Sequence, residues 1–167
     1  MAKARGAATP ALAVLDKARV RYEVLEHAHD PRSTAFGPEA VEKLGLPSEA
    51  VFKTLLVDAG GSTVTAVVPV GSQLDLKALA SAVGAKGAQL LDPSVAQRVT
   101  GYVVGGISPL GQRKCHPCVV DDSALGLSTV YVSGGRRGLS VGLAPADLIV
   151  AMAALVAPIT RSRTQRD

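Results

Sequence analysis

The sequence predicts an α/β (α+β) fold in which a curved, barrel-like, mixed and mostly antiparallel sheet is surrounded by short helices. Two pairs of strand-like segments are each joined by a glycine turn, at Ala59-Gly60-Gly61 and at residues 134–138, which is typical of antiparallel hairpins. Short helix patterns with capping residues lie between these pairs. A doubly wound or α/β-barrel layout would alternate single strands with helices, so both layouts are disfavoured.

The length and composition indicate a single domain. The chain has 167 residues, of which 47% are hydrophobic, so it can bury a core and is not a disordered chain. We expect a flexible leader over residues 1–8, one domain over residues 9–158 and a basic tail over residues 159–167. The sequence shows no internal repeat and no linker inside the domain.

In the first half of the chain, capping and turn residues mark where elements begin and end. A threonine followed by a proline is typical of a helix start. The threonine hydroxyl accepts a hydrogen bond from a backbone N–H of the first turn, and the N–H that proline lacks would have no intrahelical acceptor at that position. The expected elements are a helix from Thr9-Pro10 to about Ala18, a strand over residues 20–25, a loop over residues 27–37, a helix from Pro38 to Gly45, and strands over residues 51–57 and 63–70.

In the second half, two aspartates suit the starts of helices, and a glycine suits the end of the first of them. The expected elements are helices from Asp75 to Val83, just before Gly84, and from Asp92-Pro93 to about Val99, strands over residues 102–104, 119–121, 129–133 and 139–143, and a last helix that begins at Pro145 and ends at Ala157-Pro158.

The charge and the apolar stretches limit the partners. A net charge of +4 permits contact with a nucleic-acid backbone without demanding it. An aromatic content of 3% argues against a platform that stacks several bases. The apolar stretches over residues 11–15 and 148–156 are too short for a signal peptide or a membrane span. We therefore expect a cytoplasmic protein with reduced cysteines and with neither membrane nor DNA as a partner.

Lys53 is the most informative single residue. It lies in Val51-Phe52-Lys53-Thr54-Leu55-Leu56-Val57, where strand alternation places apolar side chains on both faces. Lysine is unfavourable in a buried strand unless it is paired or functional. Lys53 is therefore either a side chain that extends to solvent from the strand end or an anchor for an anionic ligand, with Thr54 beside it as a hydroxyl partner.

A glycine-rich segment, Gly105-Gly106-Ile107-Ser108-Pro109-Leu110-Gly111, directly follows the strand expected over residues 102–104. Glycines in this position let the backbone approach a ligand and turn N–H groups toward it. The segment has neither the lysine of a P-loop nor the spacing of a dinucleotide fingerprint. It is either a plain connection or a backbone-lined site for a carbonyl or ribose oxygen.

The sequence contains parts of other known site motifs but does not complete any of them. The sequence has no Gly-x-Ser-x-Gly nucleophile motif, and His27-x-His29-Asp30 has no second set of ligands, so we expect no metal and no cofactor. Cys115-His116-Pro117-Cys118 is interpreted as two loop cysteines, because a strand follows the pair where a redox site would have a helix. Arg136 and Arg137, at the tip of the second hairpin, suit either solvent or a phosphate backbone.

Four ordered motifs resemble those of a known family. They are Phe52-Lys53-Thr54-Leu55-Leu56, Gln73-Leu74-Asp75-Leu76-Lys77, Thr100-Gly101-Tyr102 leading into residues 105–111, and Tyr131-Val132-Ser133-Gly134-Gly135 with Arg137-Gly138-Leu139. Together they are similar to the bacterial YbaK/EbsC family of freestanding Cys-tRNA(Pro) deacylases, which are related to the editing domain of prolyl-tRNA synthetases. The resemblance covers residues from about Thr9 to Ala157, and it implies the editing-domain fold and an aminoacyl-tRNA deacylase.

The resemblance also implies roles for individual residues. Lys53 matches a lysine that orients the terminal adenosine through its phosphate, and with Gly105 it forms the expected catalytic pair. The expected substrate-binding residues are His27, Phe36, Thr54, Gly106, Ile107, Ser108, Pro109, Ser133 and Ser140. Two of them depart from the family pattern: Ser140 stands where the family often has an aspartate, and His27 stands where it has a pocket tyrosine.

The implied reaction is trans-editing. Cysteine is close to proline in size, so a synthetase pocket rejects it poorly and a second enzyme removes the product. In this mechanism the substrate's own thiol attacks its ester carbonyl, and the protein supplies positioning and oxyanion stabilisation. The expected partners are the acceptor end of tRNA(Pro) and prolyl-tRNA synthetase. Cys-tRNA(Cys) is a further expected substrate of the same reaction. The alternatives are a deacylase that removes another small amino acid, such as alanine from tRNA(Pro), with an ordered water, and a non-catalytic module that binds tRNA or the synthetase.

Overall fold

The structure is a computed structural model that describes residues 8–161. The leader expected over residues 1–8 lies outside the described residues apart from Ala8. The tail expected over residues 159–167 is described only as far as residue 161. No helix in this described part of the chain is both long enough and apolar enough to cross a membrane.

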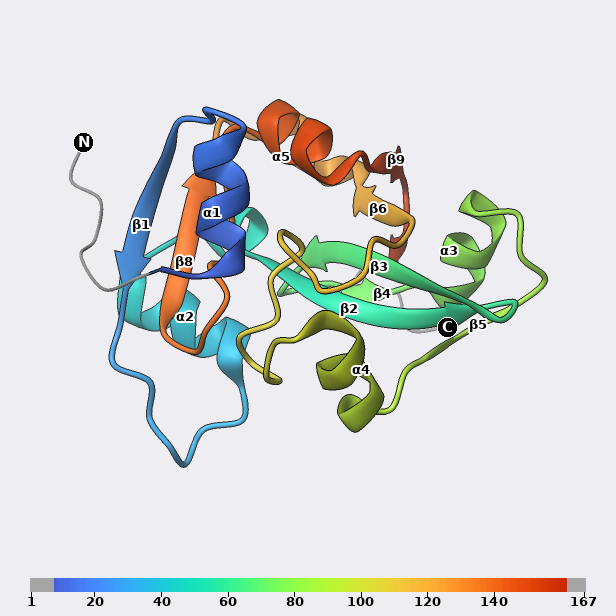
Figure 1. Cartoon of the computed structure of the whole chain (residues 1–167), viewed down its shortest axis with the longest axis horizontal. Helices are drawn as coiled ribbons and strands as arrows, with labels where there is room; N and C mark the ends of the chain where they lie inside the picture. The colour runs from blue at the N-terminus through green and yellow to red at the C-terminus, as the bar shows by residue number, and fades with distance from the viewer. Residues whose placement is uncertain (1–7, 162–167) are drawn as a thin grey trace.

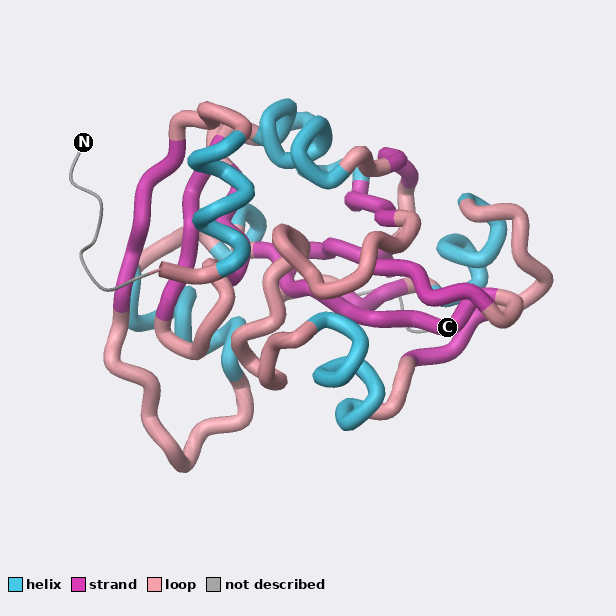
Figure 2. The backbone as a smooth tube through the Cα atoms, in the orientation of Figure 1, coloured by secondary structure: helices cyan, strands magenta, loops and turns pink. Residues whose placement is uncertain are grey.

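Short helices surround the strands (Figures 1 and 2). The helices are α1 (Pro10–Lys17), α2 (Phe36–Leu44), α3 (Leu76–Ala82), α4 (Pro93–Thr100) and α5 (Pro145–Met152). The strands are β1 (Tyr22–Glu26), β2 (Phe52–Ala59), β3 (Ser62–Pro69), β4 (Gln73–Leu74), β5 (Ala88–Leu90), β6 (Cys118–Asp121), β7 (Val130–Ser133), β8 (Leu139–Leu143), β9 (Leu155–Ala157) and β10 (Thr160–Arg161).

A five-stranded sheet and a three-stranded sheet carry the fold. The larger sheet has the order β5-β2-β3-β6-β9, the smaller has the order β1-β8-β7, and β4 pairs separately with β10. Most pairs are antiparallel, but β6 pairs in parallel with β3 and with β9. A parallel bridge between Val51 and Tyr131 joins the two sheets. The mixed, mostly antiparallel α/β arrangement is thus confirmed, as two joined sheets and the separate β4–β10 pair in the described chain.

Hydrophobic side chains fill both sides of the larger sheet. One cluster contains Phe52 and Val67 together with residues of α1 and α5, and the other contains Val57 and Val68 together with Leu79 of α3. Successive residues of a strand point to opposite faces, so β2 and β3 contribute alternate side chains to each cluster. In Figure 1, the β2–β3 hairpin extends away from the smaller sheet and α3 lies near its far end.

The glycine turn between β2 and β3 is confirmed. Gly60 and Gly61 have φ values of +63° and +89°, a left-handed conformation that L side chains disfavour and that a tight two-residue hairpin turn requires. Ala59 pairs directly with Ser62, so local turn chemistry sets the register of the longest hairpin in the described fold.

The strand expected over residues 102–104 is wrong. Tyr102 and Val104 lie in an irregular segment after α4, and side chains satisfy their backbone groups in place of a neighbouring strand. The Tyr102 N–H donates to Thr100 Oγ1 at 3.2 Å, and the Val104 N–H donates to Gln97 Oε1 at 2.9 Å. The apolar pattern reflects burial of Tyr102, whose hydroxyl donates to the Leu110 carbonyl at 2.7 Å.

The helix expected from Pro38 begins two residues earlier, at Phe36. Proline fits inside its first turn, because the first backbone N–H groups of a helix have no intrahelical acceptor. Gly45 ends the helix in the left-handed conformation, with φ +65°, as predicted. The earlier start places Phe36 and Glu39 one turn apart on the same helix.

The last helix ends at Met152 and not at Ala157-Pro158. An apolar run alone does not distinguish a helix from a buried strand, and here the residues after Ala153 form β9 alongside β6. The fold also continues past residue 158. Ile159 is fully buried and its N–H donates to the Asp121 carboxylate at 3.0 Å, so residues 159–161 belong to the packed structure and not to a tail. The short strands β4, β5, β9 and β10 have no equivalent in the sequence-based expectation.

Candidate functional site

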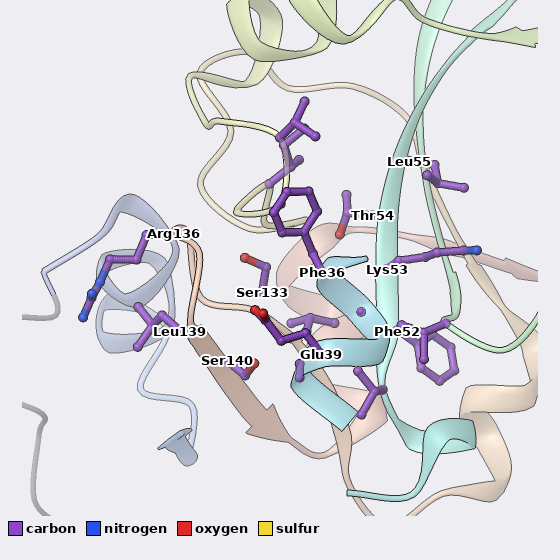
Figure 3. Close-up of a pocket in the computed structure, with 18 of the residues that line it drawn as sticks. Phe36, Glu39, Phe52, Lys53, Thr54, Leu55, Ser133, Arg136, Leu139 and Ser140 are labelled. Atoms are coloured by element: carbon purple, nitrogen blue, oxygen red, sulfur yellow. The ribbon is translucent and has the colours of Figure 1, made fainter. Parts of the chain in front are cut away.

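A cavity of about 380 Å³ lies where β2 and β7 separate. The two strands run in parallel and are bridged at Val51 and Tyr131, and beyond that bridge Thr54 and Ser133 line the cavity from either side. The volume is within the range of about 300–1,000 Å³ typical of small-molecule pockets. Figure 3 shows Phe36 and Glu39 of α2 and both serines of the β7–β8 hairpin gathered around this space.

Most of the predicted site residues line this cavity. They are His27, Phe36, Lys53, Thr54, Gly105, Ile107, Ser133 and Ser140. They come from segments as far apart in sequence as the loop after β1, α2, β2, the glycine-rich loop and the β7–β8 hairpin. The fold therefore brings together residues from segments that the sequence analysis linked to one another only through the family resemblance.

Gly106, Ser108 and Pro109 are not among the residues that line the cavity. Ser108 is fully buried, and its hydroxyl accepts a hydrogen bond from the Leu110 N–H at 3.2 Å. A Cβ atom on Gly106 would lie 2.7 Å from the Arg136 Cα atom, so the absence of a side chain lets the β7–β8 hairpin approach. These residues shape the loop that presents Gly105 and Ile107.

Gly105 is held in an unusual conformation against an aromatic ring. Its φ is +88°, and a Cβ atom there would lie 2.5 Å from the Phe36 ring. The Arg137 guanidinium lies 5.0 Å from the centre of that ring and donates to the Val104 carbonyl at 2.8 Å. No hydrogen bond among the described residues uses the Gly105 N–H. Gly105 therefore lines the cavity with a backbone N–H that the described part of the fold does not use.

Thr54 and Lys53 project from opposite faces of β2, as alternate residues of a strand must. In Figure 3 the Thr54 hydroxyl is turned toward Phe36, while the Lys53 side chain points away from it. Thr54 Oγ1 is buried and has no hydrogen-bond partner. Lys53 and Thr54, offered in one of the two interpretations above as an anchor and a hydroxyl partner for an anionic ligand, therefore face opposite sides of the strand. Both residues nevertheless line the cavity, so a ligand can contact both only by passing over the edge of the strand.

That edge is open for part of its length. β5 pairs with β2 only at Val57, Asp58 and Ala59, so the segment around Lys53 and Thr54 has β3 on one side and the cavity on the other. The predicted anchor and the predicted polar pocket residue thus lie on the two faces of an accessible strand edge.

Ser133 and Ser140 form a cross-strand pair. They are directly opposite each other on β7 and β8, and paired residues of neighbouring strands point to the same face. Ser140 is buried, with 8% of its surface exposed. A pair of hydroxyls therefore lies where a carboxylate at position 140 would have placed a negative charge. This leaves the cavity wall polar and uncharged at that point.

The sequence analysis missed Glu39, the hub of a buried polar cluster beside the cavity. Its Oε1 atom accepts hydrogen bonds from His29 Nδ1 at 2.7 Å and His27 Nε2 at 3.2 Å, and its Oε2 atom accepts from the Asp30 N–H at 3.1 Å. Lys43, one helical turn on, lies 3.8 Å from Oε2. Only 8% of the Glu39 side chain is exposed. The signal in the sequence that could have indicated this cluster is the His27-x-His29 pair, because two largely buried imidazoles require a hydrogen-bond acceptor nearby.

This cluster predicts a specific acid sensitivity. The hydrogen bond from His29, aided by those from the Asp30 N–H and His27, lowers the pKa of Glu39 from 4.5 to about 2. A carboxyl whose pKa is lower in the folded state stabilises the fold above its ordinary pKa, and the contribution disappears as the pH falls toward the folded pKa. We therefore expect the free energy of unfolding to fall between pH 5 and pH 2 partly because Glu39 is protonated.

Urea unfolding of the wild type and of Glu39→Gln over this pH range tests the prediction. The variant is expected to be less stable at pH 5 and to lose less stability on acidification. Equal pH dependence in the two proteins would contradict it. Asp75→Asn is a suitable comparison, because hydrogen bonds also lower the pKa of Asp75 but that residue is not one of those lining the cavity.

The two cysteines lie outside the cavity lining. Cys115 is exposed, Cys118 is buried, and both are free thiols. Burial raises the pKa of Cys118, which disfavours the reactive thiolate. Within residues 8–161, no group of three or more histidine, cysteine or acidic side chains is arranged to hold a metal ion.

Comparisons with known proteins converge on one activity class. A model of the family described as "Aminoacyl-tRNA editing domain" matches residues 29–150. The chain is 35% identical over 143 residues to the Enterococcus faecalis protein named "Putative Cys-tRNA(Pro)/Cys-tRNA(Cys) deacylase EbsC", with 84% of this chain and 86% of that protein covered.

More distant matches agree with this one. The proline–tRNA ligase of Geobacter sulfurreducens is 32% identical over 131 residues, which cover 74% of this chain but 22% of the ligase. A solved structure titled "Crystal structure of a putative trans-editing enzyme for prolyl tRNA synthetase" superposes with a TM-score of 0.79 at 22% identity, covering 96% of this chain and all of the other. At that identity the structural match supports the fold alone.

Proposed function

Because the chain belongs to the aminoacyl-tRNA editing domain family, we propose that it hydrolyses mischarged Cys-tRNA(Pro) to cysteine and free tRNA. The observation that carries this proposal is the cavity lined by Gly105 and Thr54, where the Gly105 N–H and the buried Thr54 hydroxyl have no hydrogen-bond partner among the described residues. Buried polar groups in proteins are normally hydrogen-bonded. A small aminoacyl ester supplies the carbonyl and polar atoms that these groups lack.

The mechanism that we propose uses the substrate's own sulfur. The cysteinyl thiolate attacks the ester carbonyl carbon, a C–S bond forms, and the C–O bond to the terminal ribose breaks. The ribose oxygen leaves with a proton as free tRNA, and water then opens the cyclic thioester to cysteine. The Gly105 N–H stabilises the oxyanion that develops on the carbonyl oxygen, and the walls of the cavity hold the thiol close to the carbonyl.

Features of the cavity support a route without a protein nucleophile. Neither cysteine lines it. The Ser133 hydroxyl accepts a hydrogen bond from the Gly135 N–H at 3.2 Å, and no described serine is hydrogen-bonded to a histidine. A serine nucleophile would need such a base within reach.

Deacylation time courses test the proposal. Purified protein is incubated with Cys-tRNA(Pro), Ser-tRNA(Pro) and Ala-tRNA(Pro), with each substrate alone as the control for spontaneous hydrolysis. Cysteine release at least ~10-fold faster than serine release is expected, because the two substrates differ only in the attacking atom. Preferential release of alanine would favour an activated water, and bound tRNA without any release would favour a non-catalytic binding module.

We also propose that prolyl-tRNA synthetase is a partner that supplies tRNA selectivity. A cavity of about 380 Å³ holds an aminoacyl end and not an anticodon. The protein alone is therefore expected to cleave Cys-tRNA(Pro) and Cys-tRNA(Cys) at similar rates. Adding the synthetase should favour Cys-tRNA(Pro), and strong discrimination by the protein alone would contradict this.

A further inference from the structure

The His27 imidazole is hydrogen-bonded on one side and unpartnered on the other. Its Nε2 atom lies 3.2 Å from Glu39 Oε1. Its Nδ1 atom is buried and has no hydrogen-bond partner. Only 7% of the side chain is exposed, and the residue lines the cavity.

The partner on the Nε2 side determines what the Nδ1 side can do. An ionised carboxylate only accepts hydrogen bonds, so the His27 nitrogen that faces Glu39 carries a proton. In the neutral ring the other nitrogen, Nδ1, then has a free lone pair. Glu39 is held in place independently of His27, by His29 and by the Asp30 N–H. The position of Glu39 therefore makes Nδ1 of the neutral His27 ring a hydrogen-bond acceptor.

A ligand in the cavity is the natural donor to this atom. A buried nitrogen without a partner is unfavourable by about 1–3 kcal/mol, and such atoms are rare in native structures. His29, which shares Glu39 Oε1 with His27, connects this cluster to the group that we assign to the oxyanion. The His29 and Phe36 rings are 5.3 Å apart, and Gly105 is packed against the same Phe36 ring.

We propose that His27 is the general base that removes the proton from the thiol of a cysteinyl substrate, and that Glu39 is its positioning residue. This inference rests on the proposed deacylase function. The thiol proton moves to Nδ1, and the thiolate sulfur attacks the ester carbonyl. The same proton then passes from the imidazolium to the departing ribose oxygen, so His27 returns to its neutral form. The Glu39 carboxylate stabilises the imidazolium while it exists.

Two substitutions separate a base from a simple hydrogen-bond acceptor. His27→Asn keeps an amide near the position of Nδ1 but is not basic, whereas His27→Gln keeps a donor toward Glu39 and removes the group at Nδ1. General bases contribute about 10²–10⁴-fold to a rate. In single-turnover assays on Cys-tRNA(Pro), both variants are expected to lower the rate of the chemical step by about 100-fold and to change KM by less than about threefold.

The controls keep folding and chemistry apart. His116→Asn removes a histidine that does not line the cavity and should leave the rate unchanged, and thermal unfolding reports whether each variant is folded. Should the His27 variants fail to fold, Glu39→Gln decides, with an expected fall of about 10-fold in rate at unchanged KM.

The outcomes distinguish this inference from the function on which it rests. Full activity of a folded His27→Asn, or of Glu39→Gln, would overturn the role of His27 as a base while leaving the deacylase function in place. A larger change in KM than in rate would show that His27 binds the substrate, for example by contacting the substrate's α-ammonium group. This outcome would also overturn the role of His27 as a base. No cysteine release by the wild type would overturn the proposed function and this inference together.

Discussion

Replacing Gly105 by alanine is expected to lower kcat/KM for Cys-tRNA(Pro) by about 100-fold or more. A Cβ atom at this position would lie 2.5 Å from the Phe36 ring, and the residue has φ +88°. A side chain in the left-handed region is unfavourable by roughly 1–2 kcal/mol. Relief of the clash must move either the ring or the loop, and either shift displaces the Gly105 N–H. Loss of one oxyanion donor typically lowers kcat by about 10²–10³-fold.

Two further variants test the physical reason. Gly71→Ala is the matched control, because a Cβ atom there meets nothing within 4 Å and the backbone is not left-handed; it should keep full activity and stability. Adding Phe36→Leu to Gly105→Ala removes the ring from the clash and should restore part of the thermal stability. Wild-type deacylation by a folded Gly105→Ala protein would show that this backbone position is not part of the reaction.

Replacing Lys53 by alanine is expected to abolish measurable turnover, a fall of at least about 100-fold in kcat/KM. Lys53 and Thr54 lie on opposite faces of an open strand edge beside the cavity. We expect the terminal nucleotide to cross this edge, with its phosphate at Lys53 and its aminoacyl group near Thr54. Without the ammonium group the ester is no longer positioned against Gly105, and positioning accounts for much of the catalysis in this mechanism.

The matched control is Lys77→Ala, which removes an exposed lysine that is not among the residues lining the cavity. It should keep full activity. Lys53→Arg keeps the charge and should retain part of the turnover. Contacts to phosphate weaken as the salt concentration rises. If the arginine misplaces the contact, the KM of Lys53→Arg should therefore depend less steeply on salt than the KM of the wild type. Unchanged turnover in Lys53→Ala would remove this lysine from the site.

The elements that the sequence predicted correctly are those defined by neighbouring residues. Two helix caps form as expected. The Thr9 hydroxyl accepts a hydrogen bond from the Leu12 N–H, and the Asp75 carboxylate accepts one from the Ala78 N–H. The glycine turn between β2 and β3 has the backbone conformation that its residues favour. Such features depend on interactions within a few positions of the chain, so they can be recognised without the rest of the fold.

Two errors arise because an apolar pattern does not show which groups satisfy the backbone hydrogen bonds. Val104 satisfies its N–H through the Gln97 side chain, so its apolar pattern did not lead to a strand. Leu155 forms a strand because β6 offers an open edge beside it. The open edge of β6 is not visible in the sequence around Leu155, and an apolar run fits a helix, a strand or a buried loop equally well.

The sequence by itself determined which chemistry is available: a lysine in an apolar strand, a glycine-rich loop, hydroxyls near a glycine turn, and no complete nucleophile motif. Only the tertiary structure decided how these parts meet. It separated Lys53 from Thr54 across a strand, set Gly105 against Phe36, and enclosed Glu39 between two histidines. The physical reason is that a side chain's neighbours, burial and proton depend on packing between segments far apart in the chain, whereas its chemical type does not.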